Sequence, residues 1–437
     1  MIVDDAERDA RLRCWIETIG GGRITRVARV GGGAYRASAR IAIERPDGRD
    51  GTLFVKVQTG PASITPFDLE REHGVLAAVA GRCRAPRPLG HDAGLDVMAT
   101  EWLPGRCDHA GRTSPARRRT ILRSLAATLA DVHRIDPADL RLGHLPAGLT
   151  RAEAIAHDLD TWTGLLLGLE VHPDPVTRFA MAWCRRRCPS DPRPATLVHG
   201  DAGPGNFLFA GAGVTGLVDW ELAHVGHPLE DLGGVLARSL MQPMADAGTL
   251  LALYAEATEA DWSRADLAYC TILTMTRFAL LIDLLLAQGA AELDLPLTSS
   301  YHRLALVSLL RLVAGAEAIT LDERVPERGR RPAITAELTY LRRLLGTVAR
   351  QAAAGEYARG RLEGAIGLLG YVEAAGVAPD VAPQADVQPG IDADTALVAS
   401  GGEPLRRRLQ ALMSEALYRE WLMRDMLGPF YGRRLAF

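Results

Sequence analysis

Three oxygen-bearing side chains near the middle of the chain have the types and the spacing that phosphoryl transfer requires. Asp201 is followed by Asn206 five positions later, and by Asp219 a further thirteen positions on. Transfer of a nucleotide γ-phosphate to a hydroxyl group requires a carboxylate that orients the hydroxyl and accepts its proton, together with oxygen ligands for one or two magnesium ions. We therefore predict that Asp201 is the base and that Asn206 and Asp219 bind Mg²⁺.

Lys56 supplies the cation that this chemistry needs on the nucleotide phosphates. Of the 50 lysines and arginines, 49 are arginines and Lys56 is the one lysine; Asn206 is likewise the one asparagine. A residue type retained once against such a bias indicates a requirement that Arg or Asp does not meet. Lys56 lies mid-strand after the glycine turn Gly31-Gly32-Gly33, as the phosphate-binding lysine of a kinase small lobe does. Its predicted acidic partner on the next helix is Glu72, with Glu70 as the alternative.

The first hundred residues have the pattern of a sheet with one inserted helix. Apolar residues alternate where strands are predicted, and they recur with helical spacing elsewhere. The predicted helices cover 6–19 and 67–80, and the predicted strands cover 23–30, 35–43, 52–57 and 95–103. This region, 1–103, is predicted to be a nucleotide-binding N-lobe.

After Pro104-Gly105 the apolar spacing becomes mostly helical, and residues 104–320 are predicted to form a helical C-lobe. One β-patterned island within it, 196–218, carries the catalytic loop and ends at the metal site. A polar, Arg-rich linker follows, and 333–437 is predicted to be a separate C-terminal helical domain. Its amphipathic segments are 333–354, 356–375 and 404–426, with a Pro/Asp/Gly-rich loop over 376–403.

These motifs together resemble one known superfamily. His199-Gly200-Asp201, Asn206, Asp219-Trp220-Glu221, Gly226-x-Pro228 and Asp231-Leu232 are similar to the motif of the aminoglycoside phosphotransferase and choline kinase superfamily. The resemblance covers roughly residues 20–320. It implies an α+β, bilobal, protein-kinase-like fold with a small β-rich N-lobe, a large helical C-lobe, and a nucleotide in the cleft between them.

The resemblance also implies further site residues. Backbone groups of Glu101-Trp102-Leu103 would be the hinge that meets the adenine edge, and Asp231 would be a scaffold carboxylate below the catalytic loop. The turn Gly31-Gly32-Gly33 would cover the phosphates. It continues with Ala34-Tyr35, where relatives often have Ser-Asn, so its phosphate contacts would come from backbone N–H groups.

A protein substrate fits the spacing less well than a small molecule does. Only six residues separate Asp219 from Gly226, and a helix is predicted from Pro228. This leaves no room for an activation segment or a peptide-docking platform. Gly200 also replaces the arginine that would bind a phosphorylated activation loop. The predicted acceptor is therefore a small-molecule hydroxyl, with Mg²⁺ and ATP or GTP as cofactor and co-substrate.

The identity of the acceptor has two readings. The stretch from Asp219 to Arg238 looks similar to the kinase-like domains associated with acyl-CoA dehydrogenases, which implies a hydroxyacyl-CoA. An aminoglycoside is the alternative acceptor. An alternative function for the protein as a whole is a non-catalytic, nucleotide-binding pseudokinase scaffold. The absence of any of Lys56, Asp201, Asn206 or Asp219 would favour that alternative.

Bulk properties give no reason to expect nucleic acid or a membrane as partner. The formal net charge is −3, and the longest apolar stretch, 278–287, contains Asp283 and is too short to span a bilayer. The N-terminal residues have neither the basic nor the apolar region of an export signal, so the expected location is the cytoplasm. The C-terminal apolar stripes would bury against the chain's own lobe or in a homodimer.

Overall fold

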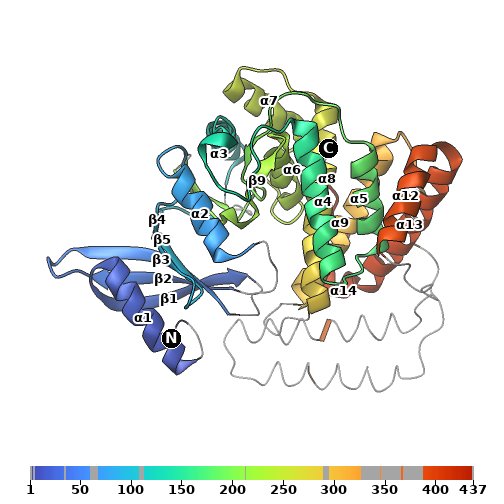
Figure 1. The fold of residues 1–437 in the computed structure, drawn as a ribbon. Coiled ribbons are helices and arrows are strands. Elements are labelled where there is room, and N and C mark those ends of the chain that lie inside the picture. The colour runs from blue at the N-terminus through green and yellow to red at the C-terminus, as the bar shows by residue number, and fades with distance from the viewer. Residues whose placement is uncertain are drawn as a thin grey trace.

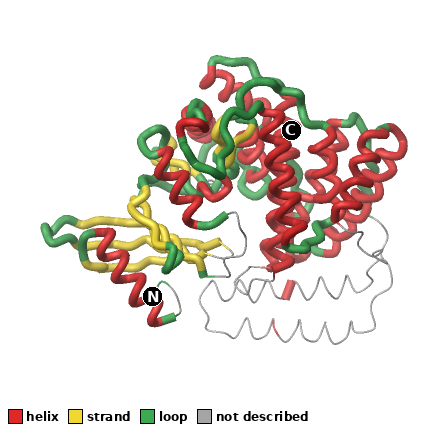
Figure 2. The backbone as a smooth tube through the Cα atoms, viewed as in Figure 1, coloured by secondary structure: helices red, strands yellow, loops and turns green. Residues whose placement is uncertain are grey.

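Two lobes of different composition make up the part of the chain that the structure describes. The computed structural model describes residues 2, 5–33, 36–59, 67–107, 113–211, 213–288, 295–325, 345, 366–367 and 387–435. A small lobe built on a sheet stands beside a larger, helical lobe (Figures 1 and 2). The predicted α+β, bilobal, kinase-like fold is confirmed.

The small lobe is a five-stranded antiparallel sheet in the order β1-β2-β3-β5-β4. Its elements are α1 (Ala6–Gly20), β1 (Arg23–Gly33), β2 (Arg36–Glu44), β3 (Asp50–Gln58), α2 (Leu69–Val79), β4 (Pro88–Asp92) and β5 (Val97–Glu101). Val55 and Val57 of β3 are fully buried in a cluster that includes Leu12 of α1. Because successive side chains of a strand point to opposite faces, Lys56 faces away from α1 and toward α2.

Strand β4 is an element that the sequence pattern does not predict. It is a sheet edge that begins at Pro88, and its pairing with β5 is irregular between Pro88 and Gly90. Proline and glycine are depleted from central strands but tolerated at edges and bulges. The residues that hide β4 in the sequence are therefore those that an edge strand accepts.

Helix α2 is held in place at its N-terminus by Asp68. The Asp68 carboxylate accepts a hydrogen bond from the backbone N–H of Arg71 at 2.7 Å, which satisfies one of the free donors of the first turn. The apolar residues Val75 and Leu76 of α2 are buried in the core shared with the large lobe. This packing fixes the face of α2 that carries Glu72.

In its described residues the large lobe is built from helices around two short antiparallel strand pairs, β6 with β9 and β7 with β8. Its elements are α3 (Pro115–His133), α4 (Arg151–Gly168), α5 (Pro175–Arg186), β6 (Thr196–Val198), β7 (Phe207–Ala210), β8 (Gly213–Leu217), β9 (His224–Gly226), α6 (Leu229–Arg238), α7 (Ala247–Thr258), α8 (Arg264–Gln288) and α9 (Leu295–Ala316). Helices α6 and α8 cross closely at Gly233. A Cβ atom there would lie 2.9 Å from the Cys270 carbonyl oxygen and 3.0 Å from the Thr271 Cα. A side chain at this position would force the two helices apart.

Helix α8 is the one described helix that is long and apolar enough to cross a membrane. The segment is Arg264–Ala287, and 72% of its most apolar window is buried inside the protein. Its neighbours include α5, α6 and α9, and residues such as Leu273 and Met275 belong to the main core. Helix α8 is therefore packed as a central helix of the large lobe.

The described C-terminal residues pack onto the large lobe and share its core. Helix α12 (Val387–Ser400) lies on α5, and α13 (Gly402–Leu422) lies on α9, followed by the short α14 (Arg424–Leu427) (Figure 1). Leu405, Leu409 and Leu412 are buried in the same cluster as residues of α9. These stripes are thus covered within one chain. The predicted helices over 333–354 and 356–375 lie outside the described residues, apart from 345 and 366–367.

The predicted loop over 376–403 is wrong for residues 387–400, which form α12. Ile391, Asp394 and Val398 are buried on one face of this helix. Asp394 pairs with Arg178 at 3.0 Å and with Arg408 at 3.3 Å. The loop was predicted from the Pro, Asp and Gly content of the stretch, but one of these residues, Asp394, lies on the buried face of a helix because arginines of neighbouring helices pair with it.

Candidate active site

Lys56 lies at the centre of a group of carboxylates contributed by both lobes. Its Nζ donates to both carboxylate oxygens of Glu72, at 2.9 and 2.8 Å, and to Oδ1 of Asp219 at 2.6 Å. Glu70 is exposed, so Glu72 is the partner on α2. Burial by itself opposes the charged ammonium, but the carboxylates of Asp219 and Glu72 raise the pKa of Lys56 above its ordinary value. Lys56 is therefore a fully charged cation.

Asp219 reaches Lys56 through an unusual backbone conformation. It has φ 68° and ψ 63°, in the left-handed region that residues other than glycine seldom adopt. The turn leads from β8 into the short helix Trp220–Leu222. Burial favours the neutral acid, but the charges of Lys56 and Arg36 outweigh it and lower the pKa of Asp219 to about 2. Such backbone outliers cluster at functional sites because the surrounding structure must hold them.

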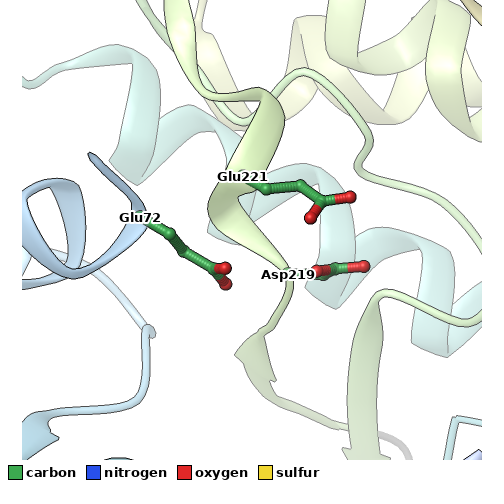
Figure 3. Close-up of side chains that lie close together, drawn as sticks. All are labelled: Glu72, Asp219 and Glu221. Atoms are coloured by element: carbon green, nitrogen blue, oxygen red, sulfur yellow. The ribbon is translucent and has the colours of Figure 1, made fainter. Parts of the chain in front are cut away.

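Glu221 is a third carboxylate beside Glu72 and Asp219. Figure 3 shows the three side chains from α2 and from the segment after β8 gathered together, and their oxygens lie within 4.8 Å of one another. Burial, and secondly the charge of Asp219, raise the pKa of Glu221 to about 7. The sequence motif includes Glu221, but its part in this cluster is not predicted.

A second cation, Arg36, also enters this cluster and was missed by the sequence analysis. Its guanidinium pairs with Glu221, lies 3.6 Å from the Glu72 carboxylate, and donates through Nε to the Gln58 side chain at 3.2 Å. The signal for it was strand periodicity. Arg36 and Ser38 of β2 stand opposite Gln58 and Lys56 of β3, so Arg36 shares the face of Lys56.

The catalytic loop is fixed from below by Asp231. Its carboxylate accepts the backbone N–H groups of His199, at 2.9 Å, and of Gly200, at 2.8 Å, as the predicted scaffold role requires. The His133 ring lies 2.9 Å from the same carboxylate, and its other nitrogen lies 2.6 Å from the Tyr254 hydroxyl. Asp231 thus connects the loop to α3 and, through His133, to α7.

Gly200 is required by the geometry of this loop. Its φ is +84°, and a Cβ atom would lie 2.2 Å from the carbonyl oxygen of Leu222. No side chain can occupy that space without moving the backbone of the segment after Asp219. The position that distinguishes this chain from protein kinases is therefore also a packing requirement.

Asp201 is held by a bidentate arginine and by the predicted asparagine. Arg238 pairs with both carboxylate oxygens, and its Nε lies 2.6 Å from Oδ1. The Asn206 Nδ2 donates to Oδ2 at 2.7 Å. Arg238 was missed by the sequence analysis, although it lies seven residues after Asp231 and hence on the same face of α6. The two acidic motifs are connected by this helix face.

The residues fit a divalent cation of the magnesium type. Carboxylate and amide oxygens are the ligands that Mg²⁺ uses in proteins, and the described carboxylate group of Glu72, Asp219 and Glu221 consists of oxygen donors alone. Asn206 uses its amide nitrogen on Asp201, which leaves its amide oxygen as the atom for a cation. The donor chemistry therefore agrees with the predicted ligands Asn206 and Asp219.

The glycine turn and the hinge have the predicted positions, but their roles remain predictions. Gly31, Gly32 and Gly33 end β1, and Gly33 stands opposite Arg36 in the hairpin; residues 34–35 lie outside the described range. Glu101 ends β5, and Trp102 and Leu103 follow it toward the large lobe. The Trp102 ring lies beneath the guanidinium of Arg40, 4.8 Å from its centroid.

A cavity opens next to the two acidic motifs. Its volume is about 180 Å³, and both Asp201 and Asp219 line it. Its apolar lining includes Phe67, Trp162, Met241, Phe278 and Leu281, and its charged lining includes Arg71, Asp158, Glu221, Arg238 and Arg277. The rings of Phe67 and Trp162 lie 5.1 Å apart. This is a concave, largely apolar site that reaches the candidate base.

This fold and this site define a small-molecule kinase of the kinase-like phosphotransferase type. Residues 15–268, more than half of the chain, match the family model described as "Phosphotransferase enzyme family". The chain therefore belongs to this family of enzymes, as the motif resemblance indicates.

Curated relatives are similar over about two fifths of the chain. They are described as acyl-CoA dehydrogenase family member 11; the rat protein is 29% identical over 194 residues, and the mouse protein 31% identical over 194 residues. Each match covers 41% of this chain and 24% of the relative. The matched segment thus corresponds to about a quarter of the length of those relatives.

Solved structures share the fold. One from Ralstonia eutropha, assigned as an aminoglycoside phosphotransferase, has a TM-score of 0.53 at 19% identity, and covers 72% of this chain and 99% of its own. Another, the aminoglycoside phosphotransferase APH(4)-Ia in a complex with AMP-PNP and hygromycin B, has a TM-score of 0.50 at 12% identity, with coverages of 70% and 99%. At these identities the similarity establishes the fold alone.

Proposed function

We propose that this enzyme transfers the γ-phosphate of ATP to a hydroxyl group of a small molecule that lies in the cavity beside Asp201. One observation supports the proposal above all: Lys56 contacts Asp219, Asn206 contacts Asp201, and Asp201 and Asp219 line the same cavity. The cation, the metal-binding oxygens and the base thus belong to one continuous site across the two lobes.

In the proposed step the acceptor oxygen forms a bond to the γ-phosphorus. The bond from that phosphorus to the bridging oxygen breaks, and the nucleoside diphosphate leaves. The hydroxyl proton passes to the carboxylate of Asp201. Arg238 and Asn206 hold this carboxylate in place, so its orientation is set before the acceptor arrives. This placement is the main contribution that phosphoryl transfer asks of a protein.

Lys56, oriented by Glu72, would bind the α/β-phosphates. Asp219 and Asn206 would hold Mg²⁺, which when bound neutralises charge on the phosphates. Arg36 adds a second cation where the glycine turn offers no polar side chain. The APH(4)-Ia structure contains an ATP analogue, and this supports ATP as the phosphate donor.

The acceptor that we propose is a hydroxyacyl compound, such as a hydroxyacyl-CoA. Its support is the similarity to acyl-CoA dehydrogenase family member 11 and the apolar rings of the cavity. A dry cavity of about 150 Å³ accommodates a molecule of benzene's size, so a space of about 180 Å³ suits a short acyl chain. An aminoglycoside is the second candidate acceptor.

An Asp201→Asn enzyme tests the proposed base. The amide keeps the shape of the carboxylate and cannot accept the proton, so kcat should fall by about 10²–10⁴-fold. Mg²⁺-dependent binding of ATP, measured by calorimetry, should stay within about threefold. A variant that retained full turnover would remove Asp201 from its role. Binding of ATP by the native enzyme with no turnover of any acceptor would instead favour the pseudokinase reading.

A further inference from the structure

Among the charged side chains that line the cavity beside Asp201, positive and negative groups are not fully matched in pairs. What we infer from this rests on the proposed function. Most charged side chains that line the cavity have a partner of opposite charge. The pairs are Asp201 with Arg238, Asp219 with Lys56, Glu221 with Arg36, and Asp158 with Arg277 at 3.5 Å. Arg71 is the exception: in the described ranges it has no carboxylate within ion-pair distance.

Arg71 is also incompletely hydrogen-bonded. It lies in the first turn of α2, and its Nη2 donates to the backbone carbonyl of Ala223 at 3.0 Å. Its Nε is buried and has no hydrogen-bond partner among the residues that the structure describes. The guanidinium lies 5.9 Å from the centre of the Phe67 ring, which forms part of the cavity wall. A buried donor left unpaired is costly, so an acceptor for it is expected in the occupied site.

Two carboxylates lie near Arg71, and neither forms an ion pair with it. Asp68 and, less strongly, Asp158 attract the guanidinium through space. Asp158 faces the same cavity and lies 3.5 Å from Arg277 of α8 as an ion pair, and its Oδ2 has no hydrogen-bond partner among the described residues. Arg277 in turn pairs with Glu230 and contacts the His224 ring. In the described part of the cavity every lining carboxylate thus has an ion pair, whereas Arg71 has none.

We infer that the acceptor of this enzyme is a hydroxy compound that carries an oxyanion, and that Arg71 binds that oxyanion. Guanidinium groups bind carboxylates and phosphates through charge-assisted hydrogen bonds, and an Nε donor adds to this geometry. The apolar body of the acceptor lies against Phe67, Trp162 and Phe278, and its hydroxyl group reaches Asp201. A polycationic acceptor would be repelled by Arg71, and the lining carboxylates already have arginine or lysine partners.

The test uses three acceptors that share one body: a six-carbon hydroxycarboxylic acid, its methyl ester and its coenzyme A thioester. Nucleotide consumption is measured with the full-length enzyme and with Arg71→Met. The acid offers a carboxylate, the thioester offers phosphates, and the ester offers no charge. We expect the native enzyme to have the lower KM for one of the two anionic compounds, which identifies the source of the oxyanion. Arg71→Met should raise that KM by about 10- to 100-fold and leave the ester's unchanged.

Two controls separate this role from a structural one. Arg82→Met removes an exposed arginine just after α2, paired with Asp139 at 3.6 Å, and should change none of the three KM values. Arg71→Met should keep the ATP affinity of the native enzyme, since a variant that merely lost the Ala223 contact and displaced α2 would disturb Glu72 and weaken ATP binding.

Several results would overturn the inference. One is an equal change of KM for the ester and the anionic compounds in Arg71→Met. Another is turnover of an aminoglycoside that this substitution leaves unaffected. The inference would also be rejected if neither the acid nor the thioester reacted with, or bound to, the ATP-loaded enzyme. Any of these outcomes leaves the proposed phosphotransferase standing as long as Asp201-dependent transfer to some hydroxyl compound is observed.

Discussion

Two charged clusters in this enzyme are built in different ways. The cluster around Asp201 lies wholly in the large lobe, where Arg238, Asn206 and the Asp231 scaffold hold the loop. The cluster around Lys56 joins the lobes, since Glu72 comes from α2 and Asp219 from the segment after β8. The base is therefore positioned by packing within one lobe, whereas the phosphate-binding cation depends on the relative placement of both.

The strongest expected effect lies in the large-lobe cluster. Asp231→Asn should replace an acceptor of two backbone N–H groups by an amide that can accept fewer bonds, and its NH₂ would face another donor. Breaking a buried network of this kind costs about 3 kcal/mol or more. We expect a lower denaturant midpoint and a lower kcat. An Asp139→Asn enzyme, changed at an exposed carboxylate, is the control and should match the native enzyme.

Lys56→Met should affect the interlobe cluster and spare the other. Loss of the ammonium removes a charge-assisted contact to the phosphates, so the Kd for ATP should rise by about 10- to 100-fold in calorimetry. The control is Arg23→Met, which removes an exposed arginine at the start of β1 that pairs with Glu44 of β2. Unchanged ATP affinity in Lys56→Met would contradict the assignment of the interlobe cluster to phosphate binding.

Arg36→Met should have a smaller effect of the same kind. Arg36 adds to a cation that is already present, and we expect the Kd for ATP to rise by about three- to tenfold while the Kd for adenosine stays the same. Equal losses for ATP and adenosine would show that Arg36 acts only by holding the lobes together through Glu221.

The smallest expected effect is a pH dependence of stability. Because the folded-state pKa of Glu221 is raised to about 7 from 4.5, this group binds a proton more tightly in the folded state, and its contribution falls as the pH rises from about 4.5 to 7. For Asp219 the pKa is lowered from 3.8 to about 2, so its stabilisation is present above pH 3.8 and is lost as the pH falls toward 2.

A Glu221→Gln enzyme isolates the first of these two contributions. Urea unfolding at pH 5 and pH 8 should show a smaller loss of stability with rising pH in the variant than in the native enzyme. A loss of equal size in both enzymes would mean that Glu221 titrates as an ordinary exposed carboxyl.

The sequence revealed those parts of the site that are chemically unusual in this chain. Lys56 and Asn206 are single residues of their types, and Asn206 lies close in the sequence to Asp201 and Asp219. Arg36 and Arg238 were missed because each is one of 49 arginines, and only the tertiary fold brings them to the carboxylates. The acidic partner Glu72 was predictable because a single helix follows the strand that carries Lys56.

The fold was predictable where the apolar period is regular. Strand β2 alternates between buried and less buried residues over 39–44, and the apolar residues of the long large-lobe helices recur with helical spacing. Helix α12 was hidden by the buried Asp394, whose partners lie on α5 and α13, and β4 by the proline and glycine of an edge strand. Distant partners compensate the buried charge in α12, whereas the edge position of β4 tolerates its proline and glycine.

The most direct test follows the γ-phosphate itself. ATP labelled with ¹⁸O in the γ-phosphate is incubated with Mg²⁺, a six-carbon hydroxycarboxylic acid or its coenzyme A thioester, and the enzyme, and the products are analysed by mass spectrometry. We expect the labelled phosphoryl group on the acceptor oxygen as a phosphomonoester, at a rate that collapses in Asp201→Asn. Label recovered only as inorganic phosphate, or transfer that is indifferent to Asp201, would contradict the claim that this site is a hydroxyl phosphotransferase with Asp201 as its base.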